Sequence, residues 1–335
     1  MVRSHISKIM EKAILTKIKD TCPHLIETKI YQTGFKEGKS TAIHASRLLH
    51  EVHGPRKRKF NMLIDLQKAY DSVDRELLWK ILNERCQNDD ERYLVKLMTN
   101  LHRVSDITIG GQHINAEMGL PQGSILSPVL FNVYLEQAIK SSKKLEEMRS
   151  RGDLLAFADD MLVMTQAKGE LEMVISELES LQAKWNLRLN KKKSEILTRE
   201  NLADVGGVKC TKAVKYLGVR VVLDKKEQLK VAQEQISKNV NVLRNRLKRA
   251  EPDVLQQLVC CLARSLLIYI GTPMVTVGLW TKKDIDRIEA GQYRKILTCG
   301  NHVSNKAILH TMISMKTAGE AIMSLQRGVS VQFAR

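Results

Sequence analysis

The sequence predicts an α+β fold, in which a mixed sheet with packed helices is followed by a helical region. Short apolar runs typical of strands alternate with helical patterns between residues 59 and 223. Beyond about residue 225 the strand patterns fade and helical periodicity takes over. The chain has 335 residues, 43% of them hydrophobic, which is enough to bury the core of one large domain or the cores of two.

The N-terminal part of the chain is expected to form a helix, a buried strand, two more helices and a hairpin. Lysines interrupt every apolar stretch of the N-terminus, which excludes a signal peptide and favours an amphipathic helix. The run KFNMLIDL predicts a strand ending at Asp65, and alternation around Gly110 and Gly111 predicts the hairpin. The expected elements are a helix over 1–20, a strand over 59–66, helices over 73–82 and 91–101, and a hairpin over 105–118.

The middle of the chain combines a loop, two helices and further strands. A Gly- and Pro-rich loop, GLPQGS, leads into a helix, and the apolar run LLAFADDMLVM predicts a pair of strands with a tight turn at Asp159 and Asp160. Apolar residues then recur at helical spacing from Leu171 to Trp185. The expected elements are the loop at 119–124, helices over 125–139 and 169–186, and strands over 154–164, 187–197 and 214–223.

The rest of the sequence has the periodicity of helices, and we expect a domain boundary near residue 225. Helices are predicted over 226–250, 253–270, 282–297 and 304–314.

The charge balance indicates a polyanionic partner. The chain has 54 Lys and Arg against 37 Asp and Glu, a formal net charge of +17, which favours nucleic acid. An anionic membrane surface is the competing interpretation, but no apolar run is long enough to span a bilayer, so no membrane partner is expected. Aromatic residues make up only 4%, so contact with nucleic acid should be mostly electrostatic. Neutralising about eight phosphates predicts a slope of about −7 for log affinity against log salt.

Two basic clusters are candidate phosphate contacts, and a solvated surface is the alternative for about half of their charges. The clusters are Arg56, Lys57, Arg58 and Lys59, and Lys238, Arg244, Arg246, Lys248 and Arg249. The nearby segment GFKEGKST does not fit a phosphate-binding P-loop, because Gly34 and Gly38 enclose three residues rather than four.

The cysteines point to a reducing compartment. Six cysteines show neither CxxC pairs nor regular spacing, so we expect reduced thiols in an intracellular protein, nuclear or cytoplasmic. Cys299 and His302 have the spacing of metal ligands but lack a second pair, which argues against zinc.

Acidic residues follow two of the predicted strands. Asp65 ends one strand, and Asp159 and Asp160 lie in the turn of another pair. If the strands are neighbours, three carboxylates meet at one end of a sheet, where their oxygens suit Mg²⁺ together with substrate phosphates. A surface hairpin with two solvated aspartates is the alternative for the pair. Between the two acidic sites lies GLPQGSILSP, whose glycines allow a ligand to approach the backbone closely.

Five segments, in order, resemble motifs A to E of reverse transcriptases. They are LIDLQKAYDSVD (63–74), GLPQGSILSPVLFNVY (119–134), LLAFADDMLV (154–163), LRLNKKKSEIL (187–197) and VKYLGVRV (214–221). Their wording is most similar to non-LTR (LINE-type) retrotransposons, and YQTGFKEGKST (31–41) resembles the segment that precedes motif A there. The resemblance covers about residues 5–225, and the helical tail more loosely.

The resemblance implies a right-hand polymerase, with partial fingers at 1–60, a palm at 61–224, and a helical thumb with a C-terminal extension at 225–335. It implies an RNA-directed DNA polymerase that adds dNTPs to a DNA primer on an RNA template with two Mg²⁺ ions, for which Mn²⁺ is an alternative. Asp65 and Asp159 match the metal-binding aspartates, Asp160 the second acid of the pair, and the carbonyl of Leu66 a further metal ligand.

The resemblance also implies roles around the substrates. Tyr70 matches the aromatic gate that excludes a 2′-OH, and Lys193 matches a lysine proposed to protonate pyrophosphate, with a solvated basic turn as its alternative. Gln122 and Gly123 match the loop that lines the nascent base pair, and Phe157 and Ala158 match residues beneath the primer terminus. The primer grip matches Tyr216, Leu217 and Gly218.

The N-terminus departs from the family pattern. The chain starts at MVRSHISKIMEK, after the point where the family has a basic fingers hairpin, and no endonuclease or zinc knuckle is recognisable. We therefore expect an N-terminally truncated polymerase core. The alternative from another class is a catalytically weak or inactive nucleic-acid-binding remnant. An RNA-dependent RNA polymerase would share the acids but not the aromatic gate, and a maturase-type intron protein is a neighbouring reading.

Overall fold

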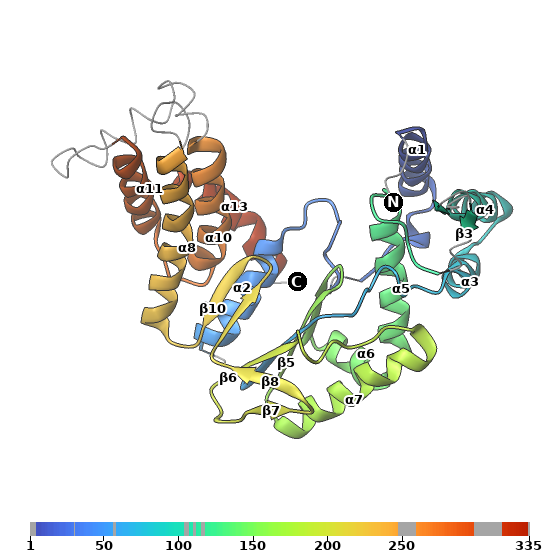
Figure 1. Cartoon of the computed structure of the whole chain (residues 1–335), viewed down its shortest axis with the longest axis horizontal. Coiled ribbons are helices and arrows are strands. Elements are labelled where there is room, and N and C mark those ends of the chain that lie inside the picture. Colours follow the sequence, from blue (N-terminus) through green and yellow to red (C-terminus); the bar gives the residue numbers. More distant parts are fainter. Residues whose placement is uncertain are drawn as a thin grey trace. The chain divides into compact units, whose positions relative to one another are not determined.

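The computed structural model describes residues 5–29, 31–55, 58–103, 107–109, 112–114, 118–246, 259–297 and 317–333. The chain forms two compact units, each assembled from segments that are distant in sequence (Figure 1). The first unit comprises residues 1–39, 59–196 and 200–210, and the second comprises 40–58, 197–199 and 211–335. The three-domain division expected from the sequence stays a prediction.

A six-stranded sheet organises the first unit, with the strand order β4-β5-β1-β6-β8-β7. Its strands are β1 (Phe60–Ile64), β4 (Leu154–Phe157), β5 (Asp160–Thr165), β6 (Glu195–Thr198), β7 (Asp204–Val205) and β8 (Val208–Thr211). Strand β5 pairs antiparallel with β4 on one side and with β1 on the other. At the outer edge of β4, Gln32 forms a parallel bridge with Ala156, so the pairing is mixed there.

The helices of the first unit pack on the sheet or on one another. They are α1 (His5–Thr21), α3 (Arg75–Arg85), α4 (Asp89–Arg103), α5 (Ser127–Ser141), α6 (Lys143–Ser150) and α7 (Lys168–Trp185). Helix α6 packs on β4, and α7 packs on β5 and β7, as the green helices of Figure 1 show. The apolar positions that predict α7, from Leu171 to Trp185, are buried in the core. Each fully buried aliphatic side chain there contributes about 1.5–3 kcal/mol of transfer free energy.

The second unit combines one hairpin with a group of helices. Its elements are α2 (Thr41–His53), β9 (Ala213–Tyr216), β10 (Val219–Val222), α8 (Lys225–Arg246), a π-helical turn (Val259–Arg264), α10 (Ser265–Thr276), α11 (Lys282–Leu297) and α13 (Ala318–Phe333). Helix α10 packs against α2 and α13, and buries Leu267, Ile270 and Met274. Helix α8 packs on β10, so the hairpin and the helices share one core.

The α+β class expected from the sequence is confirmed, as are most of its elements. The hairpin over 105–118 forms from β2 (Ile107–Ile109) and β3 (Gln112–Ile114), with the two glycines at its tip outside the described residues. The helix over 304–314 and the start of that over 253–270 also lie outside them. Helices α2, α6 and α13 and the small β7–β8 hairpin were not predicted.

Two predicted strands are wrong in form, and a turn explains each. The strand over 187–197 is interrupted by a turn at residues 191–193, because the backbone of Asn190 bends to donate to the Asp65 carbonyl, and only β6 continues as a strand. The strand over 214–223 is the β9–β10 hairpin. Leu217 and Gly218 both have positive φ, 43° and 80°, as a two-residue hairpin loop requires.

Candidate active site

The three acids expected at one end of the sheet lie on adjacent strands. Asp65 directly follows β1, and Asp160 is the first residue of β5. Because Ile64 pairs with Met161, Asp65 and Asp160 extend from the same end of two hydrogen-bonded strands. Asp159 occupies the turn between β4 and β5, next to Asp160. The topology therefore brings together carboxylates that are far apart in the sequence.

The electrostatics of the site reflect this proximity. Burial raises the pKa of Asp159, and the neighbouring charge of Asp65 raises it further. Loss of hydration raises the pKa of Asp160 to about 6, with the charges of Asp159 and Asp65 adding to the effect, although Asp160 is the more exposed of the pair. Like charges at close range disfavour ionisation. The site therefore holds negative charge that a bound cation would stabilise.

A buried glutamine holds the turn that carries the acid pair. Ala158 has a positive φ of 56°, which an L-residue adopts only at an energetic cost. The Gln32 amide donates to the Ala158 carbonyl at 3.0 Å and accepts from the Ala158 N–H at 2.9 Å. The side chain of Gln32 is fully buried. Ala158 thus lies in the turn and is buried, and Phe157 lies beside the turn and is half-buried.

A second turn holds Asp65. Asn190 donates from its side-chain amide to the Asp65 carboxylate at 2.7 Å and from its backbone to the Asp65 carbonyl at 2.9 Å. Ser194, fully buried, accepts the backbone N–H of Asp65 at 3.0 Å. The adjoining Leu66 forms an isolated bridge with Leu189. Both the carboxylate and the backbone of Asp65 are therefore positioned by the segment 189–194.

The Gly- and Pro-rich loop is held in a defined shape. Gly119 has a φ of 83°, and a Cβ there would come within 2.9 Å of the Asp71 backbone, so glycine is required. The Ser124 hydroxyl accepts the N–H groups that open α5, and the buried carboxylate of Glu11 accepts the Ile125 N–H at 2.6 Å. Gln122 and Gly123 are exposed at the tip of this loop, where a ligand could reach them.

The expected gate residue and proton donor have different surroundings. The ring of Tyr70 stacks on Phe131, with centroids 4.8 Å apart. Burial raises the pKa of Tyr70 to about 12, and the charge of Asp159 adds to this shift, which places the phenol near the acids. Lys193 is exposed in the 191–193 turn and donates its backbone N–H to Asn190. Its neighbour Lys191 pairs with Glu179 at 2.7 Å.

The expected primer-grip residues form the tip of the β9–β10 hairpin in the second unit. Tyr216 is buried, and its hydroxyl lies 3.2 Å from Nδ1 of His44. Its side chain is therefore part of the core of the second unit. The tip itself is more exposed. The Tyr269 hydroxyl donates to the Leu217 carbonyl, and the Gln235 amide donates to the Gly218 carbonyl at 2.6 Å.

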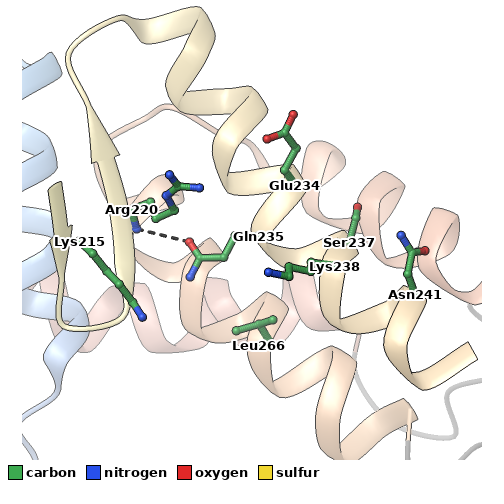
Figure 2. A pocket seen from close by; sticks show the side chains of 8 residues that line it. All are labelled: Lys215, Arg220, Glu234, Gln235, Ser237, Lys238, Asn241 and Leu266. Atoms are coloured by element: carbon green, nitrogen blue, oxygen red, sulfur yellow. Dashed lines mark hydrogen bonds between the residues drawn. The ribbon is translucent and has the colours of Figure 1, made fainter. Parts of the chain in front are cut away.

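A groove with three basic side chains lies between this hairpin and α8. It has a volume of about 560 Å³, and we call it the hairpin groove. Figure 2 shows Gln235 reaching from α8 to the backbone N–H of Arg220, 3.3 Å away, with Lys215 and Lys238 on either side of it in this view. The groove is lined by Lys215, Arg220, Glu234, Gln235, Ser237, Lys238, Asn241 and Leu266. Its charge suits a phosphate chain.

The sequence-predicted basic clusters are only partly described. Lys59 is exposed and lies 3.7 Å from Glu200, and Arg58 is half-buried. Arg56, Lys57, Lys248 and Arg249 lie outside the described residues, as do the side chains of Arg244 and Arg246 on α8. Lys238 is exposed in the hairpin groove, whereas Lys215 and Arg220 were not predicted.

Within the described part of the chain, no three His, Cys, Asp or Glu side chains already stand in a metal-binding arrangement. The three acids of the site nevertheless supply the oxygen donors that Mg²⁺ prefers. Cys22, Cys86, Cys210 and Cys261 form no disulfide bonds. None of the helices within the described ranges has the length and apolarity needed to cross a bilayer.

Sequence reasoning missed the residues that position the site. Glu11, Gln32, Asn190 and Ser194 each hydrogen-bond the backbone or carboxylate of a candidate site segment. Gln32 lies in a segment that the sequence did single out, and Asn190 and Ser194 lie in the fourth motif. Their polarity within apolar surroundings was the available signal, but their partners are set only by the fold.

The sequence of this chain is similar to those of known polymerases. The family model "Reverse transcriptase (RNA-dependent DNA polymerase)" matches residues 1–221. The RNA-directed DNA polymerase from mobile element jockey of Drosophila melanogaster is 27% identical and aligns with 66% of this chain and 26% of the relative. The probable RNA-directed DNA polymerase from transposon BS of Drosophila melanogaster is 23% identical, with 95% and 38% covered. The chain thus spans less than two fifths of the length of these relatives.

Among solved structures, the chain is similar to telomerases at low identity. Telomerase from Candida tropicalis in complex with a fragment of telomeric RNA is 14% identical, with a TM-score of 0.49, 97% of this chain and 57% of that chain covered. Telomerase from Candida albicans in complex with such a fragment is 12% identical, with a TM-score of 0.47 and coverage of 96% and 56%.

Proposed function

The chain belongs to the reverse transcriptase (RNA-dependent DNA polymerase) family, and on that premise we propose that it is the polymerase core of a non-LTR retrotransposon protein. It copies an RNA template into DNA by adding dNTPs to a primer. The sheet with Asp65, Asp159 and Asp160 serves as the palm, and the helices after β10 serve as a thumb. Two alternative functions are an inactive nucleic-acid-binding remnant and an RNA polymerase. Primer extension distinguishes both of them from the proposed function.

The convergence of three carboxylates at one end of β1 and β5 carries this proposal. Each of the two acids in the β4–β5 turn has a pKa raised partly by Asp65, so the three charges are close together. A purely structural role would not select such repulsion, whereas a site for divalent cations would. Asp65 and Asp159, with the Leu66 carbonyl, would hold two Mg²⁺ ions, or Mn²⁺, and Asp160 would support them. The ions, when bound, stabilise the negative charge that develops on the phosphate.

The reaction is an in-line nucleotidyl transfer. The 3′-OH of the primer loses its proton to solvent water and attacks the α-phosphorus of a dNTP. A new P–O bond forms, and the bond from the α-phosphorus to the bridging oxygen breaks, releasing pyrophosphate. Lys193, exposed beside the turn that positions Asp65, would donate a proton to that leaving group.

Contacts around Tyr70 support selection of deoxyribose. The ring is held by stacking on Phe131 and lies near Asp159, so it cannot turn aside without losing packing. A rigid aromatic ring beneath the sugar would collide with a 2′-OH. Gln122 and Gly123, exposed on the constrained loop, would contact the new base pair.

Grip on the primer and template is proposed for the second unit. Leu217, half-buried, and Gly218, exposed, form the tip of a hairpin, and their carbonyls are held by Tyr269 and Gln235. The hairpin groove beside it would bind backbone phosphates through Lys215, Arg220 and Lys238. Arg56, Lys57, Arg58, Lys59, Arg244 and Lys248 remain further candidates for such contacts. The cysteine pattern of the sequence, without CxxC pairs, supports action in a reducing compartment, the nucleus or cytoplasm.

Primer extension tests the proposal directly. A DNA primer annealed to an RNA template is incubated with the chain, Mg²⁺ and either dNTPs or NTPs, with Asp159→Asn as the inactive control and Lys168→Gln, on the surface of α7, as the active control. Extension with dNTPs that Asp159→Asn abolishes is the expected result. Extension with NTPs at an equal rate would indicate an RNA polymerase.

The remaining outcome separates catalysis from binding. The polymerase proposal is wrong for this chain if neither the wild type nor Asp159→Asn extends the primer, while both bind the duplex with equal, salt-sensitive affinity. The nucleic-acid-binding alternative would then stand.

A further inference from the structure

The side chain of Gln32 has no place in the chemistry described above, yet it forms two hydrogen bonds with the acid-bearing turn. Its Oε1 accepts the backbone N–H of Ala158 at 2.9 Å and that of Gly34 at 3.0 Å. Its Nε2 donates to the Ala158 carbonyl at 3.0 Å. Gln32 thereby binds both backbone groups of one residue, the residue directly before Asp159.

The surroundings leave this contact little freedom. Gln32 is fully buried, so water cannot replace its hydrogen bonds. The backbone on both sides of it pairs with β4, through Ala156 N–H to the Tyr31 carbonyl at 2.8 Å and Thr33 N–H to the Ala156 carbonyl at 3.0 Å. Asn132 on α5 holds Gly34 in the same segment by donating to its carbonyl at 2.8 Å.

Close packing reinforces the hydrogen bonds. A Cβ at Gly34 would lie 2.4 Å from the Ala158 backbone nitrogen, so the two chain segments touch. Ala158 has the left-handed φ of 56° that orients the turn. An alanine favours negative φ, so other residues must hold it in this conformation. The segment 31–34 therefore supplies the support that the turn sequence FADD lacks.

We propose that Gln32 is a positioning residue for the proposed active site, whose amide holds Ala158 in its left-handed conformation and so presents Asp159 and Asp160 beside Asp65. The inference rests on the proposed function for its catalytic consequence. Its structural content, that Gln32 determines the turn, can be tested separately.

Hydrogen exchange at the Ala158 amide tests the structural part. In Gln32→Met, a variant of similar volume without hydrogen-bonding atoms, exchange at Ala158 should accelerate at least about tenfold, because the N–H loses its buried acceptor. The measurement is exchange mass spectrometry with fragmentation of the peptide spanning 154–162. Val174→Ala, at a buried position of α7, is the control for lost stability and should leave Ala158 within about twofold of the wild type. Equal protection in Gln32→Met and the wild type would overturn the proposal.

Cation binding tests the functional part without turnover. Mn²⁺ titrated into the chain and followed by electron paramagnetic resonance should bind about five- to tenfold more weakly in Gln32→Met, because the acids are less well oriented. Duplex affinity at fixed salt should stay unchanged. In primer extension at saturating Mg²⁺, kcat should fall about 10- to 100-fold while the KM for dNTP changes little.

The outcomes separate the two proposals. If wild type and Asp159→Asn bind Mn²⁺ equally weakly, the proposed metal chemistry is wrong, and hydrogen exchange alone decides whether Gln32 holds the turn. If Gln32→Met does not fold, Gln32→Asn serves as the milder variant, because it keeps a buried amide but is one methylene too short to reach both backbone groups of Ala158. Unchanged exchange, Mn²⁺ affinity and kcat in a folded variant would overturn the inference.

Discussion

The side-chain amide of Asn190 donates a hydrogen bond to the carboxylate of Asp65, with Nδ2 and Oδ2 2.7 Å apart. This contact fixes the rotation of the first candidate metal ligand from a segment that belongs to a different motif. We expect Asn190→Ala to lower kcat for primer extension about 10- to 100-fold, as outer contacts of metal ligands commonly do. Steady-state extension with the purified variant measures this effect.

The neighbouring Lys191 supplies the matched control. It pairs with Glu179 at 2.7 Å on the surface of the same turn, an interaction worth about 0–1 kcal/mol. Lys191→Ala should therefore extend primers at the wild-type rate. Equal losses in both variants would mean that the turn as a whole matters and that the amide of Asn190 has no separate role.

Removing the charge of Asp160 should stabilise the metal-free protein at neutral pH. The pKa of Asp160 in the fold is about 6, above its ordinary value of 3.8, so the folded chain holds this proton more tightly than the unfolded chain. Ionisation therefore costs stability that is retained below about pH 4 and lost as pH rises through 6. Because the carboxylate is partly exposed, we expect a gain of about 1 kcal/mol for Asp160→Asn at pH 7.5.

Thermal unfolding in EDTA between pH 4 and pH 8 measures the difference between Asp160→Asn and wild type. The gap in melting temperature should close toward pH 4, where both side chains are neutral. Adding Mg²⁺ at pH 7.5 should narrow it by stabilising the wild type. A gap that is the same at every pH would show that the substitution acts through packing.

His44 should make the second unit sensitive to acid. Burial lowers its pKa to about 4 from an ordinary value of 6.5, and its Nδ1 lies 3.2 Å from the Tyr216 hydroxyl. The unfolded chain binds this proton first, so the stability contributed by neutral His44 is present above pH 6.5 and is lost as pH falls toward 4. At pH 5 the wild type should have lost about 2 kcal/mol from this residue.

Urea unfolding of wild type and His44→Gln at pH 7 and pH 5 tests this expectation. The variant is expected to be less stable at pH 7, because it changes the buried contact between His44 and the Tyr216 hydroxyl. Its stability should fall less on acidification, because glutamine does not take up a proton. A parallel decrease in both proteins would assign the acid sensitivity to other groups.

The hairpin groove should contribute to the salt dependence of duplex binding. Replacing Lys215, Arg220 and Lys238 together by Gln removes three cations that line it. Each lost phosphate contact lowers the log–log salt slope by about 0.9, so the slope should become shallower by about 2 to 3. Fluorescence anisotropy of a labelled duplex across a KCl series measures it. Lys168→Gln, whose side chain pairs with Glu172 on α7, should leave the slope unchanged.

Local patterns carried the prediction of α7 and of the acid-bearing hairpin, because the periodicity of burial along a helix or strand is written in consecutive residues. The same reasoning failed where a polar contact interrupts the pattern. The apolar residues at 187 and 189 favoured one long strand, but the bond from Asn190 to Asp65 turns the chain. It also failed at 214–223, where the glycine in YLG marks a hairpin inside an otherwise strand-like run.

By itself, the sequence determined the α+β class, the order of the five motifs and the reverse transcriptase resemblance, since these depend on residue type and spacing along the chain. The tertiary structure decided which side chains hold the acids. Gln32 meets Ala158 across 126 residues, Asn190 meets Asp65 across 125, and Glu11 meets Ile125 across 114. A hydrogen bond needs its two atoms about 3 Å apart in a favourable direction. Hydrophobic periodicity does not encode such a meeting, and only the packing of the sheet and helices creates it.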